Sequence, residues 1–246
     1  MIKNYLTIAF RQLYKNKIYS ILNIGGLALG LAAFLLILEF VSLERSVNKF
    51  HSKLPNMYRL LCQNTQGENW PQVEPGWAEI MKAKLPEVNS YCRFPDGIAQ
   101  GIVQNQLKNI SFREQNITYT EGNFFEFFSF PLLSGIAADL KNPDVAFISQ
   151  SYAKKYFGDE SPIGKTLQLY NRFGDRAYTV KGVYKDIGDE SDIRYDMVFS
   201  LETLKNKANL NGNSWADLDN LDNQYMNMFL ELSPHADYKA LEKKFT

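Results

Sequence analysis

Histidine, which often carries catalysis or binds metals, is scarce in this sequence of 246 residues. The sequence contains two histidines, and neither His51 nor His235 stands at metal-ligand spacing from cysteines or acidic residues. No serine lies in a G-x-S-x-G motif, so the pattern of a nucleophilic hydrolase is missing as well. We therefore expect no metal, no cofactor and no enzymatic activity, and an anchored hydrolase is disfavoured.

Cysteine is equally rare, with Cys62 and Cys92 as its only occurrences. Two cysteines are too few for a disulfide framework. A single bridge between them stays open if the domain is exported to an oxidising compartment. Free buried thiols are an ordinary alternative.

Nucleotide and nucleic-acid sites also lack support. Gly164-Lys165-Thr166 resembles the end of a phosphate-binding loop, but Gly158 stands one residue too far upstream, and a strand-like segment follows where a helix is needed. The formal net charge is zero, and the first 20 residues hold four basic and no acidic residues. The remainder is therefore slightly acidic, which argues against a nucleic-acid partner.

The longest uncharged run extends over residues 18–38, a length that fits the roughly 20 residues needed to cross a bilayer. It is longer than the apolar core of a signal peptide, and no A-x-A cleavage site follows it. We expect a retained transmembrane helix over residues 18–43. Because the basic residues precede it, the positive-inside rule predicts a cytoplasmic N-terminus and an extracytoplasmic remainder.

Two features accompany this span. Gly26 and Gly30 form a G-x-x-x-G pair, whose spacing would let a second helix pack closely, although glycine is also common in such helices by chance. Residues 1–17 place apolar side chains at helical spacing, which predicts an amphipathic cytoplasmic helix that lies in the membrane interface or packs on protein.

The remaining residues alternate strand-like and helix-like patterns. A strand at 57–63, a helix within 75–88 and a strand at 90–94 predict a β-α-β lobe. Further on, a strand at 146–150 precedes a helix at 151–157, and alternating patterns predict paired strands at 165–170 and 177–187. The run of phenylalanines within 123–133 is interpreted as a core anchor rather than a ligand site.

Near the end of the chain, residues 222–233 read as a strand and 237–245 as the start of a helix. That helix would open a second β-α unit, so we expect the sequence to be an N-terminal piece of a longer protein. The asparagine-rich residues 206–223 are predicted to form a surface loop.

Several long segments resemble one known family. They read KNYLTIAFRQLYKNKIYSILNIGGLALGLA at the start, SVNKFHSKLPNMYRL after the span, LPEVNSYCRF, and VAFISQSYAKKYFGDESPIGKTLQL further on. They are similar to ABC transporter permeases of the MacB/FtsX type, with the MacB-like periplasmic core domain in the version abundant in Bacteroidetes. One departure is visible: Ser191-Asp192-Ile193 stands where relatives tend to have Ser-His-Ile, which argues against a histidine-dependent role for this loop.

The resemblance implies an α+β fold, with one transmembrane helix and then a two-lobed periplasmic core domain at 46–246. A Porter-like βαβ lobe would be split in sequence around an inserted, mostly-β lobe. The expected bounds are 53–96 plus 222–246 for the Porter-like lobe and 97–221 for the insert.

The resemblance also implies the function. The chain would be a permease subunit in the bacterial inner membrane that pairs as a homo- or heterodimer, binds a cytoplasmic ABC ATPase and transmits ATP-driven movement to the periplasm, where a partner protein could act. Efflux, lipoprotein and cell-envelope roles all occur in the family. The alternative is a membrane-anchored extracytoplasmic sensor or interaction module that has no ATPase partner.

Overall fold

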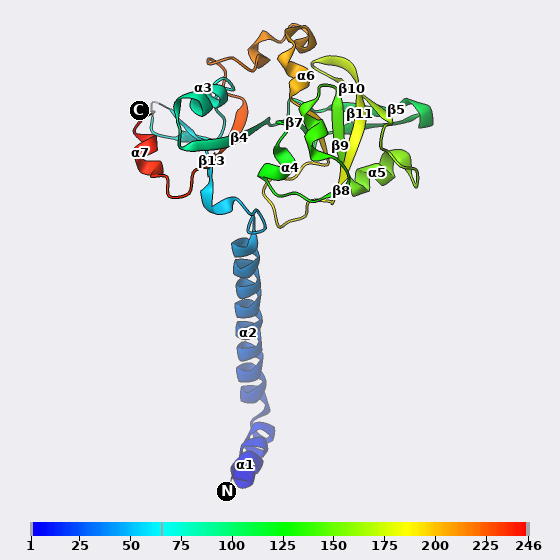
Figure 1. The fold of residues 1–246 in the computed structure, drawn as a ribbon. Coiled ribbons are helices and arrows are strands. Elements are labelled where there is room, and N and C mark those ends of the chain that lie inside the picture. Colours follow the sequence, from blue (N-terminus) through cyan, green and yellow to red (C-terminus); the bar gives the residue numbers. More distant parts are fainter. Residues whose placement is uncertain (1, 65, 245–246) are drawn as a thin grey trace. The chain divides into compact units, whose positions relative to one another are not determined.

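The computed structural model describes residues 2–64 and 66–244. The chain divides into two compact units, Met1–Val47 and Asn48–Thr246. The first unit is helical, and the second contains the sheets (Figure 1). Each unit is described by itself.

The first unit consists of α1 (Ile2–Lys15) and α2 (Lys17–Ser46), which are separated at Asn16. With 30 residues, α2 is about 45 Å long at the usual rise of an α-helix. It buries none of its residues and is long and apolar enough to cross a membrane. Its charged residues are Lys17 at its start and Glu39, Glu44 and Arg45 in its last turns, so the apolar part is shorter than the helix.

The second unit contains a smaller lobe built on a three-stranded sheet. Its strands are β1 (Met57–Arg59), β13 (Met226–Leu232) and β4 (Val88–Pro95), in the order β1-β13-β4. The central strand β13 runs antiparallel to both neighbours, so β1 and β4 are parallel to each other. Segments from both ends of the unit therefore share one sheet.

The two faces of this sheet differ. Side chains alternate along a strand, so Met228, Leu230 and Leu232 of β13 point to one face. They pack there in a core with α3 (Trp77–Lys84) and with Leu241 of α7 (Tyr238–Glu242). Asn227, Phe229 and Glu231 take the other face, which no helix of the lobe covers.

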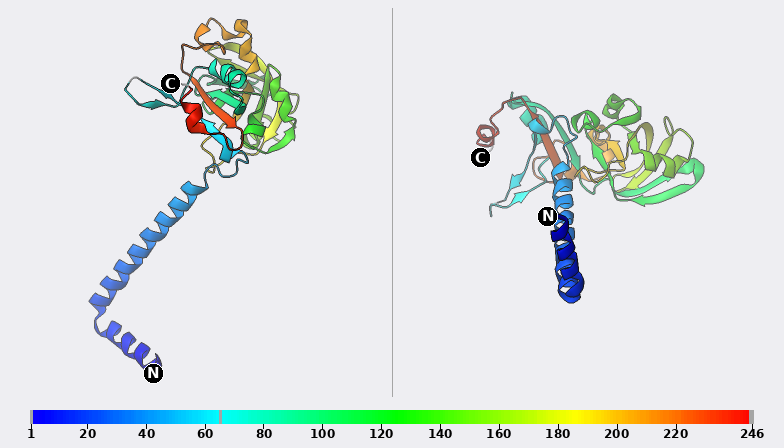
Figure 2. Two further views of the ribbon diagram at one scale, coloured as in Figure 1. Left: turned by 60° about the vertical axis from the view of Figure 1, so that its left-hand side comes forward. Right: turned by 90° about the horizontal axis from the view of Figure 1, so that it is seen from below.

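Two short elements complete this lobe. The 3-10 helix η1 (Leu54–Asn56) precedes β1. Strands β2 (Cys62–Gln63) and β3 (Asn69–Trp70) pair as a small hairpin that projects from the lobe in both views of Figure 2.

The larger lobe contains an eight-stranded mixed sheet in the order β6-β5-β10-β11-β9-β12-β7, with β8 also paired to β11. Its strands are β5 (Gly101–Asn105), β6 (Ile110–Glu114), β7 (Ile117–Thr120), β8 (Leu132–Gly135), β9 (Val145–Ser149), β10 (Thr166–Asn171), β11 (Gly174–Tyr184) and β12 (Met197–Ser200). Pairs β9–β11 and β7–β12 are parallel, and β10–β11 is an antiparallel hairpin.

The helices of the larger lobe are short. They are α4 (Phe124–Phe127), α5 (Gln150–Phe157) and α6 (Glu202–Lys205), with 3-10 turns η2 (Gln106–Lys108), η3 (Ala137–Lys141), η4 (Lys207–Leu210) and η5 (Ser214–Ala216). The Ser149 side chain accepts a hydrogen bond from the amide of Tyr152, which caps α5 as expected of a serine before a helix.

The phenylalanine run forms a core, as the sequence indicated. Five of its rings are at most 5% exposed: Phe124, Phe125, Phe127, Phe128 and Phe130. They pack with Phe147 and Tyr184 of the larger sheet and with Phe94 and Phe229 of the smaller one. The run therefore joins the two lobes rather than binding a ligand.

A glycine is required where β11 pairs with β9, because Gly182 lies opposite Phe147. A Cβ atom placed on Gly182 would lie 2.1 Å from the ring of Phe147, so only glycine fits there. The pairing also shifts register between Val180 and Gly182, where Lys181 forms a bulge.

Two expectations need correction. The segment 57–63 is not one strand: β1 ends at Arg59, and Cys62–Gln63 pairs with Asn69–Trp70 instead of with the main sheet. The predicted β-α-β unit is formed by β1, α3 and β4, and β13 lies between its two parallel strands.

The second correction concerns residues 206–223, which are not merely a surface loop. Leu210, Ala216 and Leu218 are buried in the core of the larger lobe, because the asparagine-rich segment folds into the turns η4 and η5. Composition did not indicate this burial, because the segment is rich in polar side chains. The side-chain amides of Asn211 and Asn213 donate hydrogen bonds to the backbone carbonyl of Arg172.

Candidate functional site

The second unit contains an open cleft of about 590 Å³. It lies over the face of the smaller sheet that carries Asn227 and Phe229, and part of the loop 185–196 of the larger lobe lines it. Its lining is mixed. Apolar members include Leu54, Met57, Phe94, Ile193 and Phe229; charged members are Arg59, Asp96, Asp192 and Arg194; amide members are Asn48, Gln100, Gln115, Asn116 and Asn227.

A chain of polar contacts forms the floor of this cleft. Arg59 donates to the Oδ1 atom of Asn227 at 2.5 Å, and the Nδ2 atom of Asn227 donates to Asp96 at 2.7 Å. Tyr195, from the loop of the larger lobe, donates its hydroxyl to the other carboxylate oxygen of Asp96. Asn227 is only 2% exposed, so it is fixed between a cation and an anion.

Aromatic rings support this network from beneath. The guanidinium of Arg59 lies 5.7 Å from the ring centre of Phe229, and Phe229 stacks on Phe94 at 5.7 Å. Tyr195 contacts Phe94 edge-on. Burial, and to a lesser degree the hydrogen bond to Asp96 and its charge, raise the pKa of the Tyr195 hydroxyl, so this group stays a hydrogen-bond donor at neutral pH.

The segment that follows α2 in the sequence is fastened to the same region. Asn48 exchanges side-chain hydrogen bonds with Asp192, at 2.9 Å to the carboxylate and 3.1 Å from the backbone amide, and its own amide donates to the Glu190 carbonyl at 2.8 Å. Ser52 bonds the hydroxyl of Ser129 through both its amide and its hydroxyl. These hydrogen bonds tie the first residues of the second unit to the loop 185–196 and to the segment around Ser129.

His51 is the most buried member of this entry segment, with 3% of its surface exposed. Its Nδ1 atom bonds the Phe128 carbonyl, and its ring packs among Phe50, Phe128 and Phe130. Its Nε2 atom is buried without a hydrogen-bond partner in the described structure. Burial lowers the pKa of His51, against weaker opposing effects of the Phe128 carbonyl and of Asp192.

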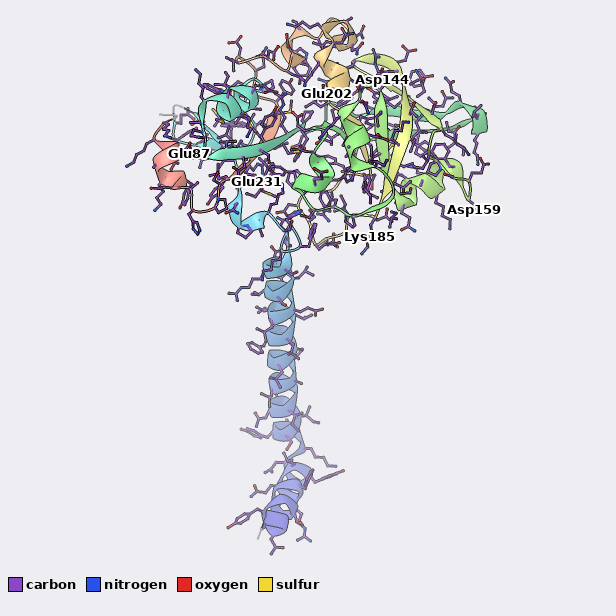
Figure 3. The ribbon with its side chains drawn as sticks, viewed as in Figure 1. Glu87, Asp144, Asp159, Lys185, Glu202 and Glu231 are labelled. Carbon is purple, nitrogen blue, oxygen red and sulfur yellow. The ribbon has the colours of Figure 1, made fainter. Side chains whose placement is uncertain are left out.

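Lys53 continues the open face of the smaller sheet beyond the cleft. It forms an ion pair with Glu231 at 2.8 Å, and Ser90 donates to the same carboxylate at 2.6 Å. Figure 3 labels Glu231 on this lobe. Lys53, Glu231 and Ser90 bond one another, so this part of the face has its charges paired. The polar groups around Arg59 lie in the cleft instead.

The sequence model of the family described as "MacB-like periplasmic core domain" matches residues 20–246, which include nearly all of α2 and the whole second unit. This chain belongs to the MacB-like periplasmic core domain family. The family is found in ABC transporter permease-type proteins, as the earlier resemblance indicated. No curated protein matches the chain in sequence.

Solved structures agree on the fold of this MacB-like domain. A domain described as a permease protein from Porphyromonas gingivalis is 22% identical, with a TM-score of 0.63, covering 79% of this chain and 82% of that one. The periplasmic region of MacB from Actinobacillus actinomycetemcomitans is 19% identical, with a TM-score of 0.55, covering 82% and 83%. The extracellular domain of the ABC-type transporter YknZ from Gram-positive bacteria is 14% identical, with a TM-score of 0.50, covering 75% and 88%.

The glycines singled out from the sequence lie on α2 of this MacB-like chain. A Cβ atom added at Gly26 or Gly30 would meet no atom within 4 Å. The helix surface is therefore open at both positions within the chain, and the space needed for a second helix is present. Their role in packing stays a prediction.

The residues of the cleft were not found from the sequence. The best signal was Asn227, a polar residue inside the otherwise apolar strand MNMFLEL, which marks a buried amide with specific partners. Asp192 was noted only as a departure from the Ser-His-Ile pattern. In the structure its carboxylate holds Asn48, and the histidine beside it, His51, comes from a different segment.

Proposed function

We propose that this chain is the N-terminal part of a permease subunit of an ABC transporter in the bacterial inner membrane. Residues 1–17 form its cytoplasmic helix, residues 18–43 its first membrane span, and residues 46–246 its periplasmic domain. Within that domain, 53–96 and 222–246 supply the Porter-like lobe, and 97–221 the inserted lobe. The family match, which covers the apolar helix and the domain as one continuous segment, is the observation that supports this most strongly.

The proposed role is to transmit ATP-driven movement of the span to the periplasmic side. A helix satisfies its backbone hydrogen bonds internally, so it can cross lipid as a stiff element. Only a short connection separates the end of α2 at Ser46 from Asn48, which is fixed to Asp192 and Glu190. Movement of the helix end would therefore reach the domain through few flexible bonds.

The energy for this movement would come from a separate cytoplasmic ABC ATPase. The one sequence similar to a phosphate-binding loop leads into strand β10 at Thr166, and Lys165 is paired with Glu160. Two permease subunits, identical or related, would pack through the Gly26 and Gly30 face of α2. A periplasmic partner protein is a further expectation of this role.

The test uses the full-length permease purified after co-expression with a candidate ABC ATPase. A Glu44→Cys substitution near the outer end of α2 reports the distance between two copies through disulfide cross-linking. We expect the cross-linking yield to change between the nucleotide-free state and the state trapped with ADP and vanadate. An ATPase variant that lacks its catalytic glutamate, which cannot reach the trapped state, is the control.

Two results would contradict the proposal. One is a permease that purifies without any ATPase. The other is a complex whose cross-linking is the same in every nucleotide state. Either result would instead favour an anchored interaction module.

A further inference from the structure

Arg59 is a cation without an ionic partner at the edge of the cleft. Ten ion pairs occur among residues 2–64 and 66–244, and Arg59 takes part in none of them. Its Nη2 atom donates to Asn227 and more weakly, at 3.5 Å, to the Pro71 carbonyl. A guanidinium has five N–H donors, so several of them remain for a ligand.

The structure holds this guanidinium in place without neutralising it. Asn227 stands between Arg59 and Asp96: its carbonyl oxygen accepts from the arginine and its amide nitrogen donates to the carboxylate. Both oxygens of Asp96 are occupied, one by Asn227 and one by Tyr195. The ring of Phe229 beneath Arg59 limits its motion further, since a guanidinium over an aromatic face is attracted to it.

A planar anion of single charge fits this arrangement better than a phosphate does. An arginine binds a carboxylate through two parallel hydrogen bonds. The carboxylates of Asp96 and Asp192 also line the cleft, and they would repel a doubly charged phosphate more strongly than a carboxylate. Gln100 and Gln115 on the wall add neutral amide groups, which can donate to a carboxylate or accept from the group beside it.

We infer that the cleft is a binding site for the carboxylate group of a ligand, with Arg59 as its anchor. A cleft of about 590 Å³ is within the size range of small-molecule sites and holds more than a lone carboxylate. The carboxylate could belong to the carboxyl terminus of a polypeptide or to a free organic acid. This inference does not depend on an ATPase, so its failure would leave the proposed function untouched.

The test follows methyl signals of methionine by NMR in the full chain in detergent. Met57 lines the cleft, whereas Met228 lies in the core on the opposite face of the same sheet. The probes are acetate, N-acetyl-tetraalanine with a free carboxyl terminus, and the same peptide with a terminal amide. We expect both carboxylates, but not the amide, to shift the Met57 signal while the Met228 signal stays in place.

The matched variants are Arg59→Gln and Arg113→Gln, since Arg113 is an exposed arginine on the edge strand β6. We expect Arg59→Gln to weaken the binding of the carboxylates at least about tenfold and Arg113→Gln to leave it unchanged. Arg59→Lys keeps the charge but loses the paired donors, so its affinity should fall between the two. An unchanged Met228 signal in each variant shows that the sheet is intact.

Tighter binding of the peptide than of acetate would assign the carboxylate to a polypeptide end, and equal binding would assign it to small organic acids. The inference is overturned if the amidated peptide shifts Met57 as strongly as the free acid does. It is also overturned if Arg59→Gln binds as tightly as Arg113→Gln, or if no carboxylate shifts Met57 up to high millimolar concentration.

Discussion

Arg93 shows how much one buried polar side chain contributes to joining the two lobes. Although 1% exposed, it donates to the Glu121 carboxylate at 2.6 Å and to the carbonyls of Pro75 and Leu218 at 2.6 and 3.2 Å. These partners come from segments far apart in the sequence. A charge with so many buried partners is costly to remove, because each partner is then left unsatisfied.

We therefore predict that Arg93→Met lowers the free energy of unfolding by about 3–5 kcal/mol, the usual cost of breaking a buried pair. Thermal or denaturant unfolding of the purified chain measures this. Adding Glu121→Gln should recover part of the loss, because the unpaired buried charge is then gone. Arg113→Met, at an exposed site, should change stability by no more than about 0.5 kcal/mol. If Arg93→Met lowered the free energy of unfolding as little as Arg113→Met does, this account of the lobe junction would be contradicted.

His51 gives the domain a pH dependence whose sign follows from its burial. Its pKa is lowered in the folded protein, so the unfolded chain takes up a proton more readily between the usual pKa of about 6.5 and the folded value. Stability should therefore fall as the pH drops through this window, by at most about 1.4 kcal/mol per pH unit for this group.

The variant His51→Asn tests this, because its amide can donate to the Phe128 carbonyl but does not titrate. We predict that its free energy of unfolding declines less than that of the native chain between neutral pH and pH 5. Parallel pH profiles for the two proteins would show that His51 does not titrate in this window.

At the scale of elements, strands and helices with strong periodicity were predicted well from the sequence. The predicted helix at 151–157 is α5, and the paired strands at 165–170 and 177–187 are β10 and β11. The prediction of one strand at 57–63 failed because a continuous apolar run does not show which strand each residue pairs with. Strand β1 ends at Arg59, the Leu60 amide still donates to the Met228 carbonyl of β13 at 2.9 Å, and Cys62–Gln63 then pairs elsewhere. The turns at 206–223 failed because their core contacts are few and separated by asparagines.

Helix α2 carries the prediction that belongs to this scale. Replacing Gly26 and Gly30 together by leucine fills the face through which a second helix would approach, so we expect dimers of the full permease to weaken. Size-exclusion chromatography with light scattering in detergent measures the dimer fraction. Ala28→Leu is the matched control, because residue 28 lies about 200° around the helix from residue 26. Unchanged dimers in the glycine variant, or an equal loss in Ala28→Leu, would refute a role for this face.

At the scale of the whole molecule, the residue patterns indicated an apolar anchor before a domain of alternating strands and helices, and the resemblance supplied the α+β fold and the family. The residue patterns did not show that β13 lies between β1 and β4, because the pairing of β1 with β13 joins residues about 170 positions apart. The cleft was unpredictable for the same reason. Arg59, Asp96, Tyr195 and Asn227 come from four separate segments, and only the completed sheet brings them together.

The central claim is that α2 spans the membrane with the second unit outside the cytoplasm. Single cysteines test it most directly, in a Cys62→Ser background where the remaining Cys92 is fully buried. Leu107→Cys lies at the tip of the β5–β6 hairpin, where the native side chain is 90% exposed, and Tyr5→Cys replaces a side chain that is 68% exposed on α1. Both are treated with a membrane-impermeant maleimide in intact spheroplasts. The account predicts that Leu107→Cys reacts at once and that Tyr5→Cys reacts only after the membrane is permeabilised; labelling of Leu107→Cys only after permeabilisation would contradict it.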